Sequence, residues 1–190
     1  MDITWLYPGS AAFAKEPRGV EFLKEEPSQR KTFEAWRTFW PQTGSPPHWD
    51  GIARDATMGD WLLFETKANQ PEFCSHICGA VGKGRALIES AMSKVKRHLG
   101  VHRDFQWLGT YYQYANRLAC LYFLNVLRKV PARLVLVYFI GDKFPDARQC
   151  PSSEAEWREL IRACHLTLGL SEEHALRDRV HELFIPVAGE

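Results

Sequence analysis

The sequence predicts an α/β fold, with a small mixed β-sheet flanked by helices and an enlarged helical layer. Two β-rich segments carry apolar side chains on both faces, as strands buried on both sides of a sheet do. Long segments with apolar side chains at helical spacing lie around them. The chain has 190 residues, of which 45% are hydrophobic and 25% are charged. This size and composition fit a single globular domain over residues 1–190.

The first half of the chain predicts a helix followed by a β-hairpin. Ser28 can cap a helix whose aromatic residues recur at helical spacing, and Pro41 ends that helix. Residues 48–55 and 60–68 have the pattern of two strands, and the second is apolar on both faces. The four residues 56–59 join them as a tight turn.

The second half predicts a helical layer and a central strand. Helices over about 84–99 and 105–128 carry apolar stripes and form the layer. Residues 133–140 are β-branched and aromatic on both faces, which predicts a central strand. The remaining predicted elements are a helix capped by Ser152 or Ser153 that runs to about Leu168, a short turn of helix from Ser171, and a final strand near 183–187.

Charge and hydropathy restrict the partners that the composition alone can support. The chain has 24 Lys and Arg against 23 Asp and Glu, a net charge of +1, so a nucleic-acid partner has to be argued from a local patch. The N-terminal residues lack the basic start and apolar core of a signal peptide, and no apolar run is long enough to span a bilayer. We therefore expect a cytoplasmic protein with no membrane partner.

Two carboxylates and a lysine form the strongest chemical constellation in the sequence. Strand residues i and i+2 share a face, so Glu65 and Lys67 project together. If residues 56–59 close the hairpin, Asp50 lies directly opposite Glu65. Opposed carboxylates repel and require a compensating cation or a raised pKa. A few hard oxygen ligands with room for water suit Mg²⁺ or Mn²⁺.

Asp50, followed after the hairpin by Glu65-Thr66-Lys67, resembles the PD-(D/E)xK nuclease superfamily over roughly residues 28–70. The resemblance implies a restriction-endonuclease-like core with the element order α-β-β-β-α-β. It also implies that Asp50, Glu65 and the carbonyl of Thr66 bind the metal, and that Asp50, Glu65 and Lys67 are catalytic. The implied activity is metal-dependent hydrolysis of phosphodiester bonds, with DNA as the favoured substrate.

Further residues are candidates for the same site. Several members of the superfamily add a helical glutamate, for which Glu34 is the first candidate and Glu21 the second. His48 could support the site from the start of the hairpin. The chain departs from the family pattern because Trp49 replaces the proline before the aspartate, and because the first core strand is either residues 36–39 or displaced.

The second long helix carries a polar face. Gln113, Asn116 and Arg117 lie together at helical spacing. By the resemblance, Gln113 could contact substrate, whereas within an apolar layer all three could form a buried hydrogen-bond network. A basic segment offers phosphate contacts, for which the candidates are Lys83, Arg85, Lys94 and Arg97. A charged, solvated helix face explains these four residues equally well.

Two other functional classes stay open beside a nuclease. One is a non-catalytic nuclease-like subunit that binds nucleic acid or protein, which the near-zero net charge favours and the intact Asp50, Glu65 and Lys67 disfavour. The other is a small-molecule enzyme with a helical pocket around Gln113 and Arg117, which a deep apolar cavity remote from Glu65 would favour. A homodimer is compatible with each class.

Overall fold

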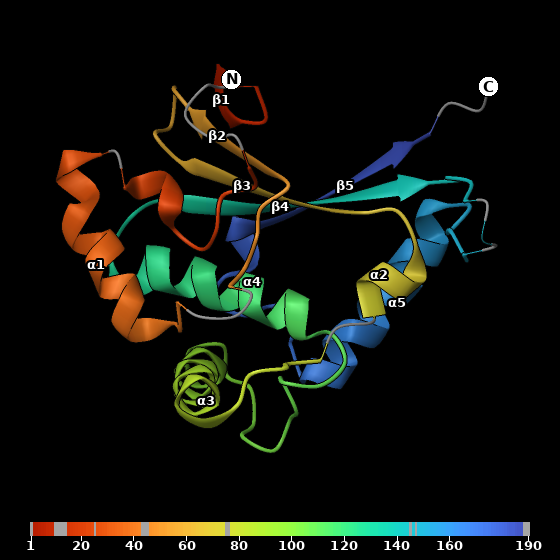
Figure 1. The fold of residues 1–190 in the computed structure, drawn as a ribbon. Coiled ribbons are helices and arrows are strands. Elements are labelled where there is room, and N and C mark those ends of the chain that lie inside the picture. The colour runs from red at the N-terminus through yellow and green to blue at the C-terminus, as the bar shows by residue number, and fades with distance from the viewer. Residues whose placement is uncertain are drawn as a thin grey trace.

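A computed structural model describes residues 2–9, 15–24, 26–42, 46–74, 77–144, 146 and 148–187. A five-stranded sheet in the order β1-β2-β3-β4-β5 runs through the molecule, and the helices lie beneath it in the view of Figure 1. The sheet is mixed. β2 pairs antiparallel with both β1 and β3, whereas β4 pairs parallel with both β3 and β5. The predicted α/β fold with a small mixed sheet flanked by helices is thus confirmed.

The strands agree with the sequence prediction in the middle of the chain and differ at its start. They are β1 (Ile3–Tyr7), β2 (Gly51–Asp55), β3 (Trp61–Lys67), β4 (Ala132–Ile140) and β5 (Val180–Pro186). β2 and β3 form the predicted hairpin, and β4 is the predicted central strand between β3 and β5. β5 begins three residues earlier than the strand predicted near 183–187.

The first strand of the sheet comes from the N-terminus. β1 pairs antiparallel with β2, with Ile3 opposite Asp55 and Trp5 opposite Ala53. Residues 36–39 belong to a helix, so of the two placements left open the displaced strand is the correct one. A helix therefore lies between the first and second strands, which departs from the α-β-β-β-α-β order. β1 is a short edge strand of five residues whose side chains are half-buried or exposed, so it has no long apolar run to mark it.

The helices are α1 (Arg30–Phe39), α2 (Gln70–Cys74), α3 (Gly82–His98), α4 (Tyr112–Tyr122) and α5 (Glu154–Leu168). Ser153 caps α5 as predicted, since its hydroxyl accepts a hydrogen bond from the N–H of Glu156 at 3.3 Å. The short helix expected from Ser171 is instead a 3₁₀ turn at Arg177–Arg179. Within the part of the chain described by the structure, no helix combines the length and apolar character that a membrane crossing requires.

α4 begins later than predicted and is the most buried helix. Tyr111 precedes it with a φ of 67°, in the left-handed region, so the helix predicted from about residue 105 starts only at Tyr112. Every residue from Tyr114 to Tyr122 is buried, and Figure 1 shows α4 between the sheet and α3. Because a helix surrounded by protein has no water for its polar side chains, Asn116 and Arg117 must find partners inside the molecule.

Asp55 fixes the turn of the β2–β3 hairpin. Its N–H donates to the carbonyl of Asp60 at 2.9 Å. Its carboxylate Oδ1 accepts from the N–H groups of Thr57 at 2.9 Å and Met58 at 3.1 Å. Gly59 completes the turn with a φ of 73°, which favours glycine. Asp55 therefore caps the turn, as its position beside the loop predicts.

The register of the hairpin is the predicted one. Ile52 pairs with Leu63, and Gly51 pairs with Phe64. The N–H of Asp50 donates to the carbonyl of Phe64 at 3.1 Å, so Asp50 bonds to the partner of Gly51, and the regular pairing ends at Gly51. Asp50 therefore lies at the end of the hairpin, where its carboxylate bonds to Thr66, the residue after Glu65.

Candidate functional site

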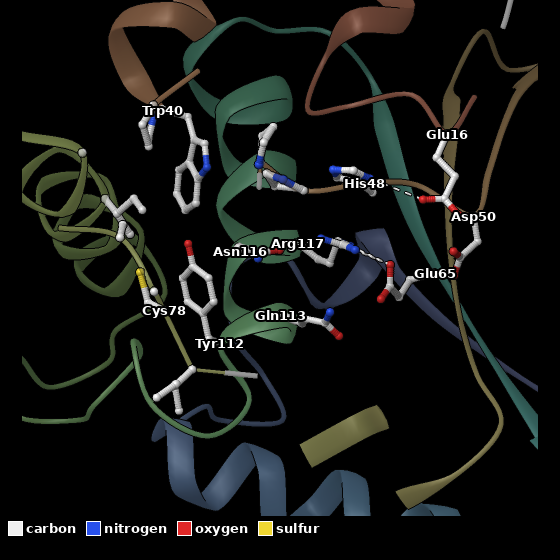
Figure 2. Close-up of a pocket in the computed structure, with 18 of the residues that line it drawn as sticks. Glu16, Trp40, His48, Asp50, Glu65, Cys78, Tyr112, Gln113, Asn116 and Arg117 are labelled. Atoms are coloured by element: carbon white, nitrogen blue, oxygen red, sulfur yellow. Dashed lines mark hydrogen bonds and ion pairs between the residues drawn. The ribbon is translucent and has the colours of Figure 1, made fainter. Parts of the chain in front are cut away.

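A cavity of about 850 Å³ lies between the end of the hairpin, α4 and the start of α3. The close-up in Figure 2 shows α4 in its centre, with the hairpin residues on one side and residues near α3 on the other. Its polar wall includes the two candidate sets from distant parts of the sequence, namely Asp50, Glu65, Lys67, Gln113, Asn116 and Arg117. The cavity is thus not remote from Glu65, contrary to what a separate small-molecule pocket would require.

Glu65 is the most heavily bonded group in this wall, although only 5% of it is exposed. Its Oε1 accepts from Lys67 Nζ at 2.7 Å. Its Oε2 accepts from Arg117 Nε at 2.8 Å and from Arg117 Nη2 at 2.5 Å. Burial by itself raises the pKa of Glu65, but the charges of Arg117 and Lys67 outweigh burial and hold the pKa below its usual value. Glu65 is therefore ionised within a buried ion cluster.

Arg117 is held on several sides. Its Nη1 donates to Asn116 Oδ1 at 2.7 Å, and its guanidinium carbon lies 4.9 Å from the ring centroid of Trp49. Trp49 is fully buried, and its indole N–H donates to the carbonyl of Gly19 at 2.8 Å. Trp49 thus supports the guanidinium through a cation–π contact. Asn116 and Arg117 form the buried network predicted as one of their two roles.

Asp50 is half-buried and uses one carboxylate oxygen for the strand beside it. Its Oδ2 accepts from the N–H of Thr66 at 2.6 Å and from the Thr66 hydroxyl at 2.9 Å. Burial first, and repulsion from Glu65 second, raise the pKa of Asp50, against the opposing effects of Thr66 and Lys67. The negative charge at Asp50 is thus incompletely compensated, as the opposed carboxylates predict.

Several oxygen atoms here have the chemistry of a hard-cation site. Among the described residues, Asp50 Oδ1 accepts no hydrogen bond. The N–H and C=O of a strand residue point to the same side, so the Thr66 carbonyl also lies toward Asp50. A carboxylate has about four acceptor positions, and Lys67 and Arg117 fill three on Glu65. This donor set fits Mg²⁺ or Mn²⁺ with additional water ligands.

Side chains alone would not complete such a site. In the described ranges, no group of three or more His, Cys, Asp and Glu side chains is placed to hold a metal ion. The two carboxylates and one carbonyl would leave several coordination positions to water and substrate. That arrangement is the usual one for Mg²⁺ sites that act with phosphate.

The candidate glutamates on helical segments do not reach the cavity. Glu34 is exposed on α1 and pairs with Arg30 one helical turn away at 3.2 Å. Glu21 is also exposed and accepts from the N–H of Arg18 at 2.9 Å. Neither lines the cavity. The reason is that the apolar stripe of α1 turns toward the core, which directs Glu34 toward solvent.

His48 does line the cavity, and it contacts a second acidic residue, Glu16, that the sequence did not indicate. His48 forms an isolated β-bridge with Arg18, and its Nδ1 lies 3.3 Å from Glu16 Oε2. Glu16 therefore also lines the cavity, as Figure 2 shows. No periodicity or motif marks Glu16 in the sequence, because only this bridge between distant segments carries it to the site.

Gln113 is the least satisfied polar residue of the α4 face. Its side-chain oxygen is buried and has no hydrogen-bond partner among the residues that the structure describes. In Figure 2 the Gln113 side chain extends from α4 toward the side of Glu65. Leaving a buried acceptor unpaired is unfavourable by about 1–3 kcal/mol, so this oxygen is a position where a ligand donor would be stabilised.

The four phosphate-contacting candidates on α3 lie outside the cavity wall. α3 turns Gly84 and Ile88 toward the cavity instead. Arg85 pairs with Glu89 at 2.9 Å on the exposed helix surface, and the side chains of Lys83, Lys94 and Arg97 are exposed. The structure does not bring this basic segment to the carboxylates, because the apolar stripe of α3 determines which face turns inward.

The hairpin and α4 therefore converge on one cavity, although Glu65 and Arg117 are 52 residues apart in the sequence. The cavity contains an ion cluster, an incompletely compensated carboxylate and a buried unpaired acceptor. No family model, curated protein or solved structure matches the chain.

Proposed function

We propose that this protein is a metal-dependent phosphodiesterase of the PD-(D/E)xK nuclease type, with DNA as its substrate and Mg²⁺ or Mn²⁺ as its cofactor. The observation that supports the proposal is the end of the hairpin, where Asp50 bonds to Thr66, the neighbour of Glu65, and Lys67 pairs with Glu65. The raised pKa of Asp50 agrees with a site that a cation would complete. All three side chains line one cavity.

The metal-holding groups in this proposal are the carboxylates of Asp50 and Glu65 and the carbonyl of Thr66. A bound divalent ion would supply Lewis-acid polarisation of the phosphate and a lowered pKa for a bound water. The Thr66 N–H and hydroxyl fix the orientation of Asp50 through Oδ2, which leaves Oδ1 directed to other ligands. Both carboxylates are thereby held by groups of the protein itself.

Lys67 is the proposed catalytic lysine. Its ammonium lies 2.7 Å from Glu65 Oε1, and its side chain is 14% exposed at the cavity wall. At this position it can orient the attacking water and stabilise the negative charge that develops on the phosphate. A fixed cation at a water-poor wall is more effective in this role than one in bulk solvent.

Arg117 is a positioning residue in the proposal. It contacts Glu65 through two nitrogen atoms, and it is itself supported by Asn116 and Trp49. A guanidinium is always charged and has planar donor geometry, so it holds a buried carboxylate in one orientation. Arg117 thus prepares Glu65 without contacting the reacting phosphate.

The test combines metal binding with hydrolysis. Purified protein is titrated with Mn²⁺ in a calorimeter and then assayed on single-stranded DNA, duplex DNA and RNA, with Asp50→Ala as the comparison. We expect saturable Mn²⁺ binding and metal-dependent DNA cleavage in the wild type, and neither in Asp50→Ala. Absence of Mn²⁺ binding by correctly folded wild-type protein would refute the proposal.

The ion cluster also favours a second candidate, a non-catalytic nuclease-like subunit. Lys67 and Arg117 already offset the charge of Glu65 without any metal. Such a protein would bind nucleic acid or another protein with the cluster in a purely structural role. The same experiment separates the two candidates, because the subunit would bind DNA with equal affinity in the presence of Mn²⁺ and of a chelator and would not cleave it.

A further inference from the structure

The cavity has a second half that the carboxylate chemistry does not use. It lies on the α3 side of α4, where Figure 2 shows the Tyr112 ring pointing from the start of α4 toward Trp40. Ile88 of α3 continues this wall, and Ile77 and Val81 lie at its rim. The rim side chains are 72% and 82% exposed, respectively. An apolar and aromatic compartment is thus continuous with the ion cluster.

The dimensions of the cavity indicate a small ligand. Cavities of about 300–1,000 Å³ enclose single small molecules, and this one has about 850 Å³. Its carboxylates lie on the inner wall between the sheet and α4, where a ligand must enter the cavity to reach them. A flat, open and strongly basic groove, which a duplex backbone requires, is a different kind of surface.

The charge of the wall leads to the same conclusion. Three acidic and two cationic side chains line the cavity, which leaves one net negative charge when His48 is neutral; they are Glu16, Asp50, Glu65, Lys67 and Arg117. A divalent cation would convert this to one net positive charge. That value matches a single phosphodiester, whereas a duplex needs many phosphate contacts for its affinity.

We propose that the cavity takes one unpaired nucleotide, with its base in the compartment of Trp40, Tyr112 and Ile88 and its phosphate at the carboxylates. This inference rests on the proposed function and specifies its substrate as a strand end or a single-stranded nucleotide. The half-buried ring of Tyr112 can stack on the face of an unpaired base, whereas Trp40, which is 1% exposed and stacked on Trp36, forms part of the compartment wall. The unpaired oxygen of Gln113 lies on the Glu65 side of α4 and offers an acceptor to an N–H or O–H of the nucleotide there.

Gly84 provides a variant that fills the base compartment. It lines the cavity, and a Cβ built on it would lie 3.8 Å from the Cβ of Pro41, an ordinary van der Waals distance. Gly84→Phe therefore adds a ring to the compartment without a backbone clash. Ala86→Phe is the matched control, because Ala86 is exposed and lies on the opposite face of the same helix.

The experiment measures binding of dAMP, of deoxyribose 5-phosphate and of a blunt DNA duplex by tryptophan fluorescence, in the presence of Mg²⁺. We expect dAMP to bind more tightly than the other two, and Gly84→Phe to weaken its binding by about tenfold or more. Ala86→Phe should bind like the wild type. Tyr112→Ala should also weaken dAMP binding, whereas Tyr112→Phe, which keeps the ring, should not.

The outcomes distinguish this inference from the proposed function. If dAMP binds as described but no DNA is cleaved with Mn²⁺, the nucleotide compartment stands and the catalytic proposal fails. If Mn²⁺-dependent cleavage occurs but deoxyribose 5-phosphate binds as tightly as dAMP, the base compartment is refuted. Equal effects of Gly84→Phe and Ala86→Phe, or tighter binding of the duplex than of dAMP, would also overturn it.

Discussion

The same strand holds a buried carboxylate at each end, and the two are bonded in similar ways. Asp60, just before β3, is 4% exposed, and its Oδ2 accepts from Arg133 Nε at 2.6 Å and Arg179 Nη1 at 3.1 Å. Glu65, near the other end, is 5% exposed and also accepts from two cations. Burial and ion pairing therefore do not distinguish a functional carboxylate from a structural one.

The surroundings of the two carboxylates do distinguish them. The cations of Asp60 reach solvent, with side chains 26% and 40% exposed, and Asp60 does not line the cavity. Arg117, which holds Glu65, is only 6% exposed, and a second carboxylate with a raised pKa lies beside Glu65. The ion pairs of Asp60 link the start of β3 to β4 and to the turn before β5. The ion pairs of Glu65 lie instead at the wall of the cavity.

The largest expected effect is on hydrolysis. Glu65→Gln keeps the shape of the side chain but removes the charge, and we expect it to lower the rate of DNA cleavage by about 10³-fold or more, since metal-based stabilisation contributes several kcal/mol. Asp60→Asn is the matched control and should cleave at the wild-type rate. Initial rates at saturating Mn²⁺ measure both. Equal losses of cleavage rate in the two variants would contradict a functional difference between the two ends of β3.

The same two variants should also differ in their free energy of unfolding, although by a smaller amount. Glu65→Gln leaves the charge of Arg117 buried, which we expect to lower the free energy of unfolding by about 3 kcal/mol. Asp60→Asn should lower it by only about 1 kcal/mol, because Arg133 and Arg179 are partly exposed to solvent and lose less when their partner is neutral. Urea denaturation followed by circular dichroism measures both values. A larger loss of unfolding free energy in Asp60→Asn would contradict the assignment of Glu65–Arg117 as the more deeply buried ion pair.

Acidification should weaken metal binding through Asp50. Its pKa is raised above the usual 3.8 by burial and by Glu65, so Asp50 takes up a proton at a higher pH than an ordinary aspartate. Below that pKa, Mn²⁺ affinity should fall by about tenfold per pH unit, because the ion competes with one proton. The raised pKa also means that the contribution of Asp50 to stability declines as the pH rises from its unfolded toward its folded pKa.

The pH prediction has its own control. Calorimetric titrations with Mn²⁺ over a series of pH values should show this slope in the wild type. Asp50→Asn should bind Mn²⁺ more weakly and without the slope. An unchanged slope in Asp50→Asn would assign the titration to a different group.

The smallest expected effect is at Glu34. Its ion pair with Arg30 is on the surface of α1, with the two side chains 59% and 80% exposed, respectively. Glu34→Gln should change the free energy of unfolding by less than about 0.5 kcal/mol and leave DNA cleavage unchanged. Denaturation and cleavage assays test this directly. A marked loss of cleavage would show that Glu34 contributes to the active site.

Local patterns predicted the hairpin and its carboxylates, because a four-residue turn determines which side chains face each other. The central strand and the Ser153 cap also follow from short-range signals. The pairing of Glu65 with Arg117 could not be predicted in this way, since it depends on how α4 packs against β3 across 52 residues of sequence. Glu16 reaches the cavity through the bridge of Arg18 to His48, which no local pattern encodes.

The hairpin turn has a consequence for how the chain can vary. The tip residues Thr57 and Met58 offer only their backbone N–H groups to Asp55, so their side chains are free to change. The length of the turn is not free in the same way. Strand side chains alternate between faces, so one inserted residue would set Asp50 against a neighbour of Glu65 and turn the two carboxylates to opposite faces. Substitution should therefore be tolerated at a position where insertion abolishes the chemistry.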